Sequence, residues 1–197
     1  MSLYLLKTMK IKSVIFIALL CLSCSPRVEL KDYELGGDIS LLNTTGKQED
    51  LYSIFKPVTL LFIGYTSCPD FCPMTLSKIG RALKDMSIEE QAQVQTIFVS
   101  IDPEYDTPEK LAAYQKSFSY PLAAFVTPKE KLSSFLSSWG AFIQFRNQED
   151  SKARIIDHST YLYALDENKK VRYLLKRADS PDKITAVIKA IIKETDS

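Results

Sequence analysis

Cysteine and histidine are scarce in this chain, and neither sign of charge is in excess. Of 197 residues only four are cysteine and one is histidine, and 25 lysines and arginines nearly balance 24 acidic residues. The net charge of +1 gives no basic surface of the kind that binds nucleic acid, so no nucleic-acid partner is expected. Two cysteines fall within the first 24 residues, and the two that remain are too few for a disulfide scaffold. The composition is otherwise that of an ordinary globular protein, 46% hydrophobic and 25% charged.

The start of the chain lacks an apolar run of the roughly 20 residues that cross a bilayer. The apolar run at residues 11–22 is shorter, it stands beside Lys7, Lys10 and Lys12, and no acidic residue appears before Glu29. A basic start, a short apolar core and small residues at its end are typical of an export signal. We therefore expect a leader that is removed, in preference to a permanent transmembrane helix.

The end of this leader resembles the lipobox of bacterial lipoproteins, with Cys24 as the acylated residue. Cys21 stands where that motif usually has an aliphatic residue, and it is the alternative site of modification. A signal with two unmodified cysteines is a further interpretation. The predicted organisation is a lipoprotein-type signal peptide over residues 1–23, a tether over 24–35 and one domain over 36–197. Such a protein would be exported and lipid-anchored to the membrane, facing the periplasm or the cell exterior.

Buried strands and amphipathic helices alternate along the rest of the chain. Residues 58–63 form an apolar run, which is typical of a strand covered on both faces, and residues 94–101 are expected to form a second buried strand. The pattern predicts an α/β domain with a mixed central sheet flanked by helices, an added N-terminal strand region and a β-hairpin before the last helix. Residues 148–157 are polar and are expected to be the least ordered. The expected strands are 39–42, 58–63, 94–101, 122–126, 160–165 and 171–175, and the expected helices are 74–86, 108–118, 128–139 and 181–192.

Cys68 and Cys72 are four residues apart, where the strand at residues 58–63 turns into a helix. Four residues of helix rise about 6 Å, and disulfide-bonded Cα atoms lie roughly 4.4–6.8 Å apart. The two sulfurs can therefore meet, either bonded to each other or bridged by an ion. Because Cys72 sits at a helix N-terminus, we expect it to ionise more readily than a free thiol. The alternative is a plain disulfide or two buried thiols without chemistry.

His158 is the only histidine, and it directly precedes the predicted hairpin. A lone histidine often has no special role. Together with Cys68 and Cys72, however, it would give a three-coordinate site of two thiolates and an imidazole. Such soft ligands suit copper, above all Cu(I), with Cu(II) as a second candidate form. A structural zinc site needs four ligands, and no obvious fourth is present.

Four aspartates lie near these residues in the sequence and invite an acid–base interpretation. Asp70 stands between the thiols, and its charge is expected to raise their pKa values or to tune a bound metal. Asp157 is expected to orient the neighbouring histidine from outside the metal's own ligand set. Asp106 is interpreted mainly as a helix cap, with Thr107 as the other candidate. Asp102 is interpreted as the acid of an Asp-Pro turn.

Three blocks of this sequence, residues 64–73, 99–108 and 157–159, resemble the signature blocks of the Sco/SenC family. The similarity covers roughly residues 36–192. It implies a thioredoxin-like fold with copper held by Cys68, Cys72 and His158. It also implies a role in assembling the binuclear copper centre of cytochrome c oxidase, from a membrane-tethered position outside the cytoplasm. The implied partners are the oxidase subunit that holds this centre and a copper donor protein. The anchor would be a lipid on Cys24.

Two functions are compatible with the paired thiols. A copper metallochaperone would use Cys68, Cys72 and His158 as metal ligands. A thiol–disulfide oxidoreductase would use Cys68 and Cys72 as a redox-active pair that keeps the oxidase's copper-ligand cysteines reduced. Only the first function needs His158, so this residue distinguishes the two hypotheses. Whether the protein is also an enzyme therefore stays open at this stage.

Overall fold

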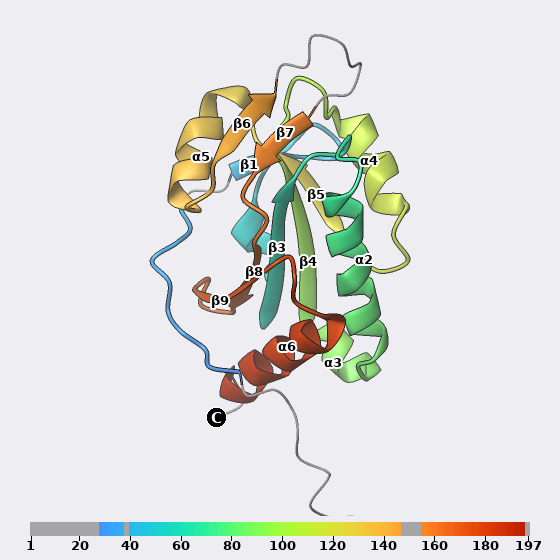
Figure 1. Cartoon of the computed structure of the whole chain (residues 1–197), viewed down its shortest axis with the longest axis vertical. Helices are drawn as coiled ribbons and strands as arrows, with labels where there is room; N and C mark the ends of the chain where they lie inside the picture. Colours follow the sequence, from blue (N-terminus) through green and yellow to red (C-terminus); the bar gives the residue numbers. More distant parts are fainter. Residues whose placement is uncertain (1–27, 38–39, 147–154, 196–197) are drawn as a thin grey trace, which may run out of the picture.

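A seven-stranded mixed sheet runs through the centre of the molecule (Figure 1). The computed structural model describes residues 28–37, 40–146 and 155–195. The strand order is β2-β1-β5-β4-β3-β8-β9. The strands are β1 (Ser40–Asn43), β2 (Gln48–Asp50), β3 (Val58–Gly64), β4 (Val94–Ser100), β5 (Ala123–Val126), β8 (Leu162–Asp166) and β9 (Val171–Leu175).

Strand β3 lies inside the sheet, between β4 and β8, and all seven of its residues are buried. It pairs in parallel with β4 on one side and antiparallel with β8 on the other. A strand covered on both faces favours apolar residues at consecutive rather than alternate positions, and five of the six residues from Val58 to Ile63 are apolar, Thr59 being the exception. The carboxyl end of β3 therefore presents the following loop from a rigid base.

Helices lie around the sheet, and the two longest, α2 (Phe71–Lys84) and α6 (Pro181–Thr195), each bury an apolar stripe. In α2 the buried residues recur at helical spacing, from Cys72 through Leu76 and Ile79 to Leu83. In Figure 1, α2 and α4 lie to the right of the sheet, α5 lies at the upper left and α6 crosses the lower end. The other helices are η1 (Leu51–Ile54), α3 (Ile88–Ala92), α4 (Pro108–Lys116), η2 (Lys129–Lys131) and α5 (Leu132–Ser138).

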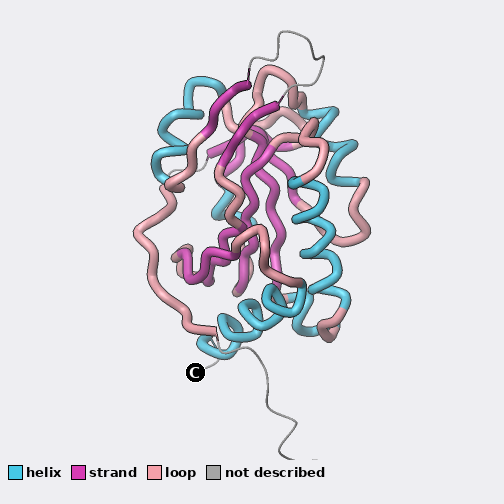
Figure 2. Tube along the Cα trace, in the orientation of Figure 1, coloured by secondary structure: helices cyan, strands magenta, loops and turns pink. Residues whose placement is uncertain are grey.

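A second, two-stranded sheet is formed by β6 (Ile143–Arg146) and β7 (Ile155–His158). It lies at the same end of the molecule as the loop between β3 and α2 (Figure 2). Residues 147–154, part of the segment expected to be least ordered, lie outside the described residues. Residues 155–157 of that segment form a regular strand instead, because their backbone pairs with β6.

The N-terminal part of the described chain follows the edge of the main sheet. The backbone N–H groups of Lys31 and Tyr33 donate to the carbonyls of Arg172 and Val171 in β9. Asp32 adds ion pairs with Arg172 and with Lys170. This pairing covers an otherwise open sheet edge. The domain boundary at residue 36 stays a prediction.

The predicted α/β fold with a mixed sheet and a hairpin before the last helix is confirmed. Four small elements, β2, η1, α3 and β7, were not expected. Helix α2 begins at Phe71, three residues before the apolar periodicity made it visible. Among the described residues, no helix is long and apolar enough to cross a membrane. The predicted signal peptide, with Cys21 and Cys24, lies outside the described residues.

Candidate metal centre

The thiol loop, residues 64–70, leaves the buried end of β3 at Gly64. A Cβ atom on Gly64 would lie 2.7 Å from the Cys72 sulfur and 3.0 Å from the Phe98 ring. Only glycine lets the Cys72 side chain pass this close to the backbone, so Gly64 is required by packing rather than by backbone conformation. The second thiol thereby reaches the base of the loop.

Cys68 and Cys72 lie together and are not bonded to each other. Both are free thiols and both are buried, with 7% of Cys68 and none of Cys72 exposed. Cys72 is the second residue of α2, and its backbone N–H donates to the Cys68 sulfur at 3.5 Å. The helix N-terminus therefore points at the sulfur of Cys68.

The two thiols have opposite pKa shifts. The pKa of Cys68 is lowered to about 3, first because the Cys72 side chain hydrogen-bonds to its thiolate. The same hydrogen bond, followed by burial, raises the pKa of Cys72. The expectation that Cys72 would ionise more readily than a free thiol is therefore wrong. The helix N-terminus does favour an anion, but its N–H group faces the neighbouring sulfur, so Cys68 carries the charge.

His158 brings an imidazole to the two sulfurs from the end of β7. Its Nε2 lies 3.9 Å from the Cys72 sulfur. Its Nδ1 lies 2.7 Å from the carbonyl oxygen of Ser159. Because a carbonyl can only accept, Nδ1 must carry a proton and donate it there. The ring also packs edge-on against Tyr65 at 5.8 Å and Phe62 at 6.4 Å between centroids.

A cleft of about 340 Å³ separates the thiol loop from β7. Asp70 and Asp157, the two aspartates expected to influence the site, both line this cleft. Asp70 is exposed and makes no capping bond with its side chain. Its backbone N–H helps to lower the pKa of Cys68, the opposite direction to the effect expected of its carboxylate. Asp157 lies on β7, but the His158 ring is oriented by the hydrogen bond that its Nδ1–H donates to the carbonyl of Ser159. A tuning role for either aspartate stays a prediction.

Asp106 is not a helix cap but a buried anchor of the thiol loop. Its carboxylate is 1% exposed and accepts from the Thr66 N–H at 2.9 Å, the Thr66 hydroxyl at 2.5 Å and the Ser100 hydroxyl at 2.5 Å. The side chain of Thr107 caps α4 in its place. The interpretation of Asp106 as the cap is therefore wrong. A buried carboxylate needs several donors, and the end of β4 and the loop provide them.

The structure brings together the three predicted ligands without closing them around an ion. Among the described residues, no three His, Cys, Asp or Glu side chains stand ready to enclose a metal. The donor set nevertheless fits a soft ion, because it offers two sulfurs and an imidazole nitrogen.

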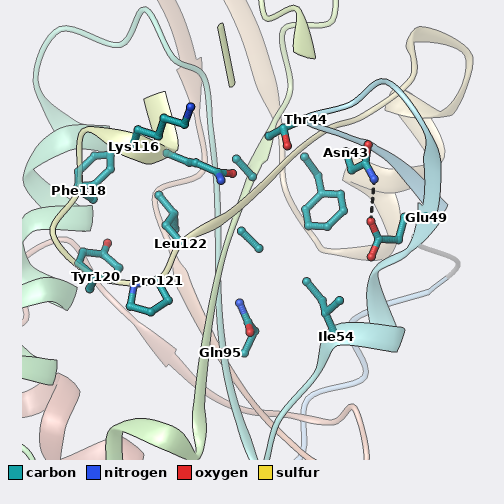
Figure 3. A pocket seen from close by; sticks show the side chains of 14 residues that line it. Asn43, Thr44, Glu49, Ile54, Gln95, Lys116, Phe118, Tyr120, Pro121 and Leu122 are labelled. Carbon is teal, nitrogen blue, oxygen red and sulfur yellow. Dashed lines mark hydrogen bonds between the residues drawn. The ribbon is translucent and has the colours of Figure 1, made fainter. Parts of the chain in front are cut away.

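A second cavity, of about 600 Å³, lies toward the amino-terminal ends of β4 and β5 (Figure 3). Its wall includes a hydrogen bond of 2.9 Å from the Asn43 amide to the Glu49 carboxylate. Its lining contains no cysteine or histidine. It therefore offers no soft donor, in contrast to the cleft beside Cys68.

Three residues, Gly64, Tyr65 and Asp106, shape the site in ways that the sequence did not predict. Gly64 could have been found, because a glycine that ends a buried strand beside a cysteine signals a close approach. Asp106 was noticed, but its local cap pattern hid the contacts to a loop 40 positions away. Tyr65 gave no signal, because an aromatic residue after a strand is most often core.

The chain is similar to proteins of one known family. The SCO1/SenC family model matches residues 28–193. The chain is 30% identical over 158 residues to Protein SCO1 homolog 1, mitochondrial, of Arabidopsis thaliana, covering 80% of this chain and 47% of that protein. This chain thus spans about half the length of that relative.

Solved structures agree with the fold. The structure of Arabidopsis thaliana ScoI with copper bound is 28% identical, with a TM-score of 0.73 over 81% of this chain and 99% of that one. BsSco, described as a member of the Sco family of cytochrome c oxidase assembly proteins with a disulfide switch, is 22% identical, with a TM-score of 0.64 over 83% of this chain and 98% of that one. The expected thioredoxin-like fold is therefore confirmed.

Proposed function

This chain belongs to the SCO1/SenC family, and we propose that it is a membrane-tethered copper metallochaperone that assists assembly of the binuclear copper centre of cytochrome c oxidase. Copper binding is supported by the copper-bound structure of a relative with the same fold. A role in oxidase assembly is supported by family membership and by the description of BsSco. The specific mechanism and the tether are our own inference.

The observation behind this proposal is the meeting of two sulfurs and one imidazole at a single cleft. Cys72 Sγ lies 3.9 Å from His158 Nε2, and the Cys72 N–H holds the Cys68 sulfur 3.5 Å away. Thiolate and imidazole are the ligands that Cu(I) prefers. Cys68, Cys72 and His158 would hold the ion, and the hydrogen bond from Nδ1 to Ser159 leaves Nε2 as the nitrogen that faces the sulfurs.

Copper here is cargo, so the site must also release it. Three protein donors leave room for a ligand from the partner, and exchange can then proceed one donor at a time. The third donor comes from β7, which belongs to a separate small sheet. Oxidation of the two thiols to a disulfide would remove both sulfur donors, so copper binding is linked to the redox state.

The location is inferred from the leader of the sequence. We expect a lipid on Cys24 to hold the domain at the membrane, facing the periplasm or the cell exterior. The proposed partners are the copper-centre subunit of the oxidase and a copper donor protein. Cu(I) is the expected working form, and Cu(II) is the second candidate.

A thiol–disulfide oxidoreductase is the second candidate function, and the unequal thiols favour it. The Cys68 thiolate would attack one sulfur of a partner's disulfide and displace the other as a thiolate. Cys72, after losing its proton, would then attack Cys68 in the mixed disulfide. The partner would leave as a dithiol and Cys68–Cys72 would become the disulfide. None of these reaction steps needs His158.

Anaerobic loading with Cu(I) tests the proposal. The chain should carry Cys21→Ser and Cys24→Ser, so that only the two site thiols can bind. We expect about one copper per chain, retained against a Cu(I) chelator. Cys68→Ser or Cys72→Ser should abolish retention, and His158→Ala should weaken affinity on the order of tenfold or more.

Ser67→Ala is the matched control, because its buried hydroxyl has no hydrogen-bond partner and it lies in the same loop. Its copper retention should equal that of the parent chain. Unchanged copper affinity in His158→Ala, together with intact reduction of a model disulfide, would instead support the oxidoreductase.

A further inference from the structure

The side chain of Tyr65 joins the thiol loop to the strand that bears His158. Tyr65 follows β3 directly and is 2% exposed. Its hydroxyl oxygen accepts a hydrogen bond of 3.2 Å from the backbone N–H of Ile156 in β7. Its ring packs edge-on against the His158 ring at 5.8 Å. One side chain therefore contacts both the backbone of β7 and the imidazole at its end.

The hydrogen bond to Tyr65 is made two residues before His158, on the same edge of β7. Ile156 is opposite Phe145 and His158 is opposite Ile143, so both stand at alternate positions of the same strand. In an antiparallel pair, alternate residues direct their backbone groups to the same side. The N–H that Tyr65 holds and the backbone of His158 therefore both face away from β6, toward the thiol loop.

We propose that Tyr65 is a positioning residue, whose hydroxyl fastens β7 to the thiol loop and so holds His158 beside the two sulfurs. This inference rests on the proposed function for the copper step, but not for the fastening itself. The buried N–H of Ile156 would lose its partner if β7 moved away, and one neutral hydrogen bond opposes that movement. Such a bond is weak enough to break during copper exchange.

Tyr65→Phe removes the hydroxyl and keeps the ring. Tyr163→Phe is the matched control, since Tyr163 is also 2% exposed and its hydroxyl also makes one buried hydrogen bond, donated to the Trp139 carbonyl at 2.9 Å. Both variants should stay folded, and Tyr65→Phe should lower the melting temperature by no more than Tyr163→Phe does. Only Tyr65→Phe should speed amide hydrogen exchange at Ile156, on the order of two- to tenfold for one neutral hydrogen bond.

Copper release supplies the second measurement. After loading with Cu(I), Tyr65→Phe should give up its copper to a chelator faster by a similar factor, while still binding one ion per chain, because all three donors remain. Unchanged exchange at Ile156 in Tyr65→Phe, or equal acceleration in both variants, would overturn the proposal. A parent chain that takes up no copper would count against the metallochaperone function, and the exchange comparison would still decide whether Tyr65 fastens β7.

Discussion

Two regions, the thiol loop and the β6–β7 arm, face each other across one cleft but are built differently. The arm consists of β6 (residues 143–146) and β7 (residues 155–158). The loop continues the fully buried strand β3 and is tied by Asp106 to the end of β4. The arm forms its own two-stranded sheet beside the main one. It contacts the loop through one hydrogen bond and one edge-on ring contact to Tyr65, and His158 makes a further edge-on contact with Phe62 in β3.

The difference indicates a division of roles between the proposed ligands. The two sulfurs are fixed by the core whether or not an ion is present. The imidazole sits on an element that can open without disturbing the core, as local opening in proteins often does. A site that must both hold and hand over an ion is served by this combination. The following four predictions test whether the two regions really differ in this way.

The largest expected effect is on the reactivity of Cys68. Because its pKa is lowered to about 3, it is a thiolate at every pH from 5 to 8. Its alkylation rate should therefore be nearly flat over this range. An ordinary thiol, with a pKa near 8.5, reacts about a thousandfold faster at pH 8 than at pH 5. Labelled peptides analysed by mass spectrometry would give the rate.

Two controls accompany this pH profile. In urea the thiolate loses its hydrogen bonds, so the ordinary steep profile should return. Cys72→Ala removes the largest cause of the shift, so the profile of Cys68 should steepen in the folded protein. A steep profile in the native parent chain would show that the loop does not hold a preformed thiolate.

The anchor of the loop should be the next most sensitive point. Asp106→Ala leaves the part-buried Thr66 N–H and the hydroxyls of Thr66 and Ser100 without their acceptor. We expect the free energy of unfolding in urea to fall by roughly 3 kcal/mol. Asp106→Asn keeps one acceptor oxygen and should cost less. A loss below about 0.5 kcal/mol for the alanine variant would mean that the loop does not depend on this anchor.

Close packing under the loop gives a smaller effect. Gly64→Ala would place a Cβ 2.7 Å from the Cys72 sulfur and should cost roughly 1–3 kcal/mol by overpacking. Gly80→Ala is the control, because its Cβ would also be crowded, at 2.9 Å from the Tyr120 ring. It gains about 1 kcal/mol of helix propensity in α2, so its net cost should be lower. Only Gly64→Ala should change the alkylation of Cys68.

Sequence patterns predicted the core of the fold and the three candidate ligands, because both depend on local signals. Apolar runs mark buried strands, and two cysteines at a strand–helix turn mark a thiol site. What the sequence did not reveal depends on geometry that only the folded chain shows. The lowered pKa of Cys68 follows first from the hydrogen bond of the Cys72 side chain to its thiolate, which the spacing of the two residues does not specify. The role of Asp106 follows from a loop 40 residues away, which no local cap pattern contains.

A matched pair of core deletions gives the smallest and most direct test of the comparison. Ile97 in β4 and Ile156 in β7 are 0% and 3% exposed, and each can be shortened to valine. Ile97→Val should lower the free energy of unfolding by about 1 kcal/mol, the usual cost of one buried methyl group. The cost of Ile156→Val cannot exceed the free energy needed to open the arm, because beyond that point the arm opens and the core stays folded. We therefore expect a smaller loss from Ile156→Val than from Ile97→Val in urea unfolding, together with faster amide exchange confined to β7. Equal losses without faster exchange in β7 would mean that the arm and the core unfold as one unit, and His158 would then be as firmly fixed as the sulfurs.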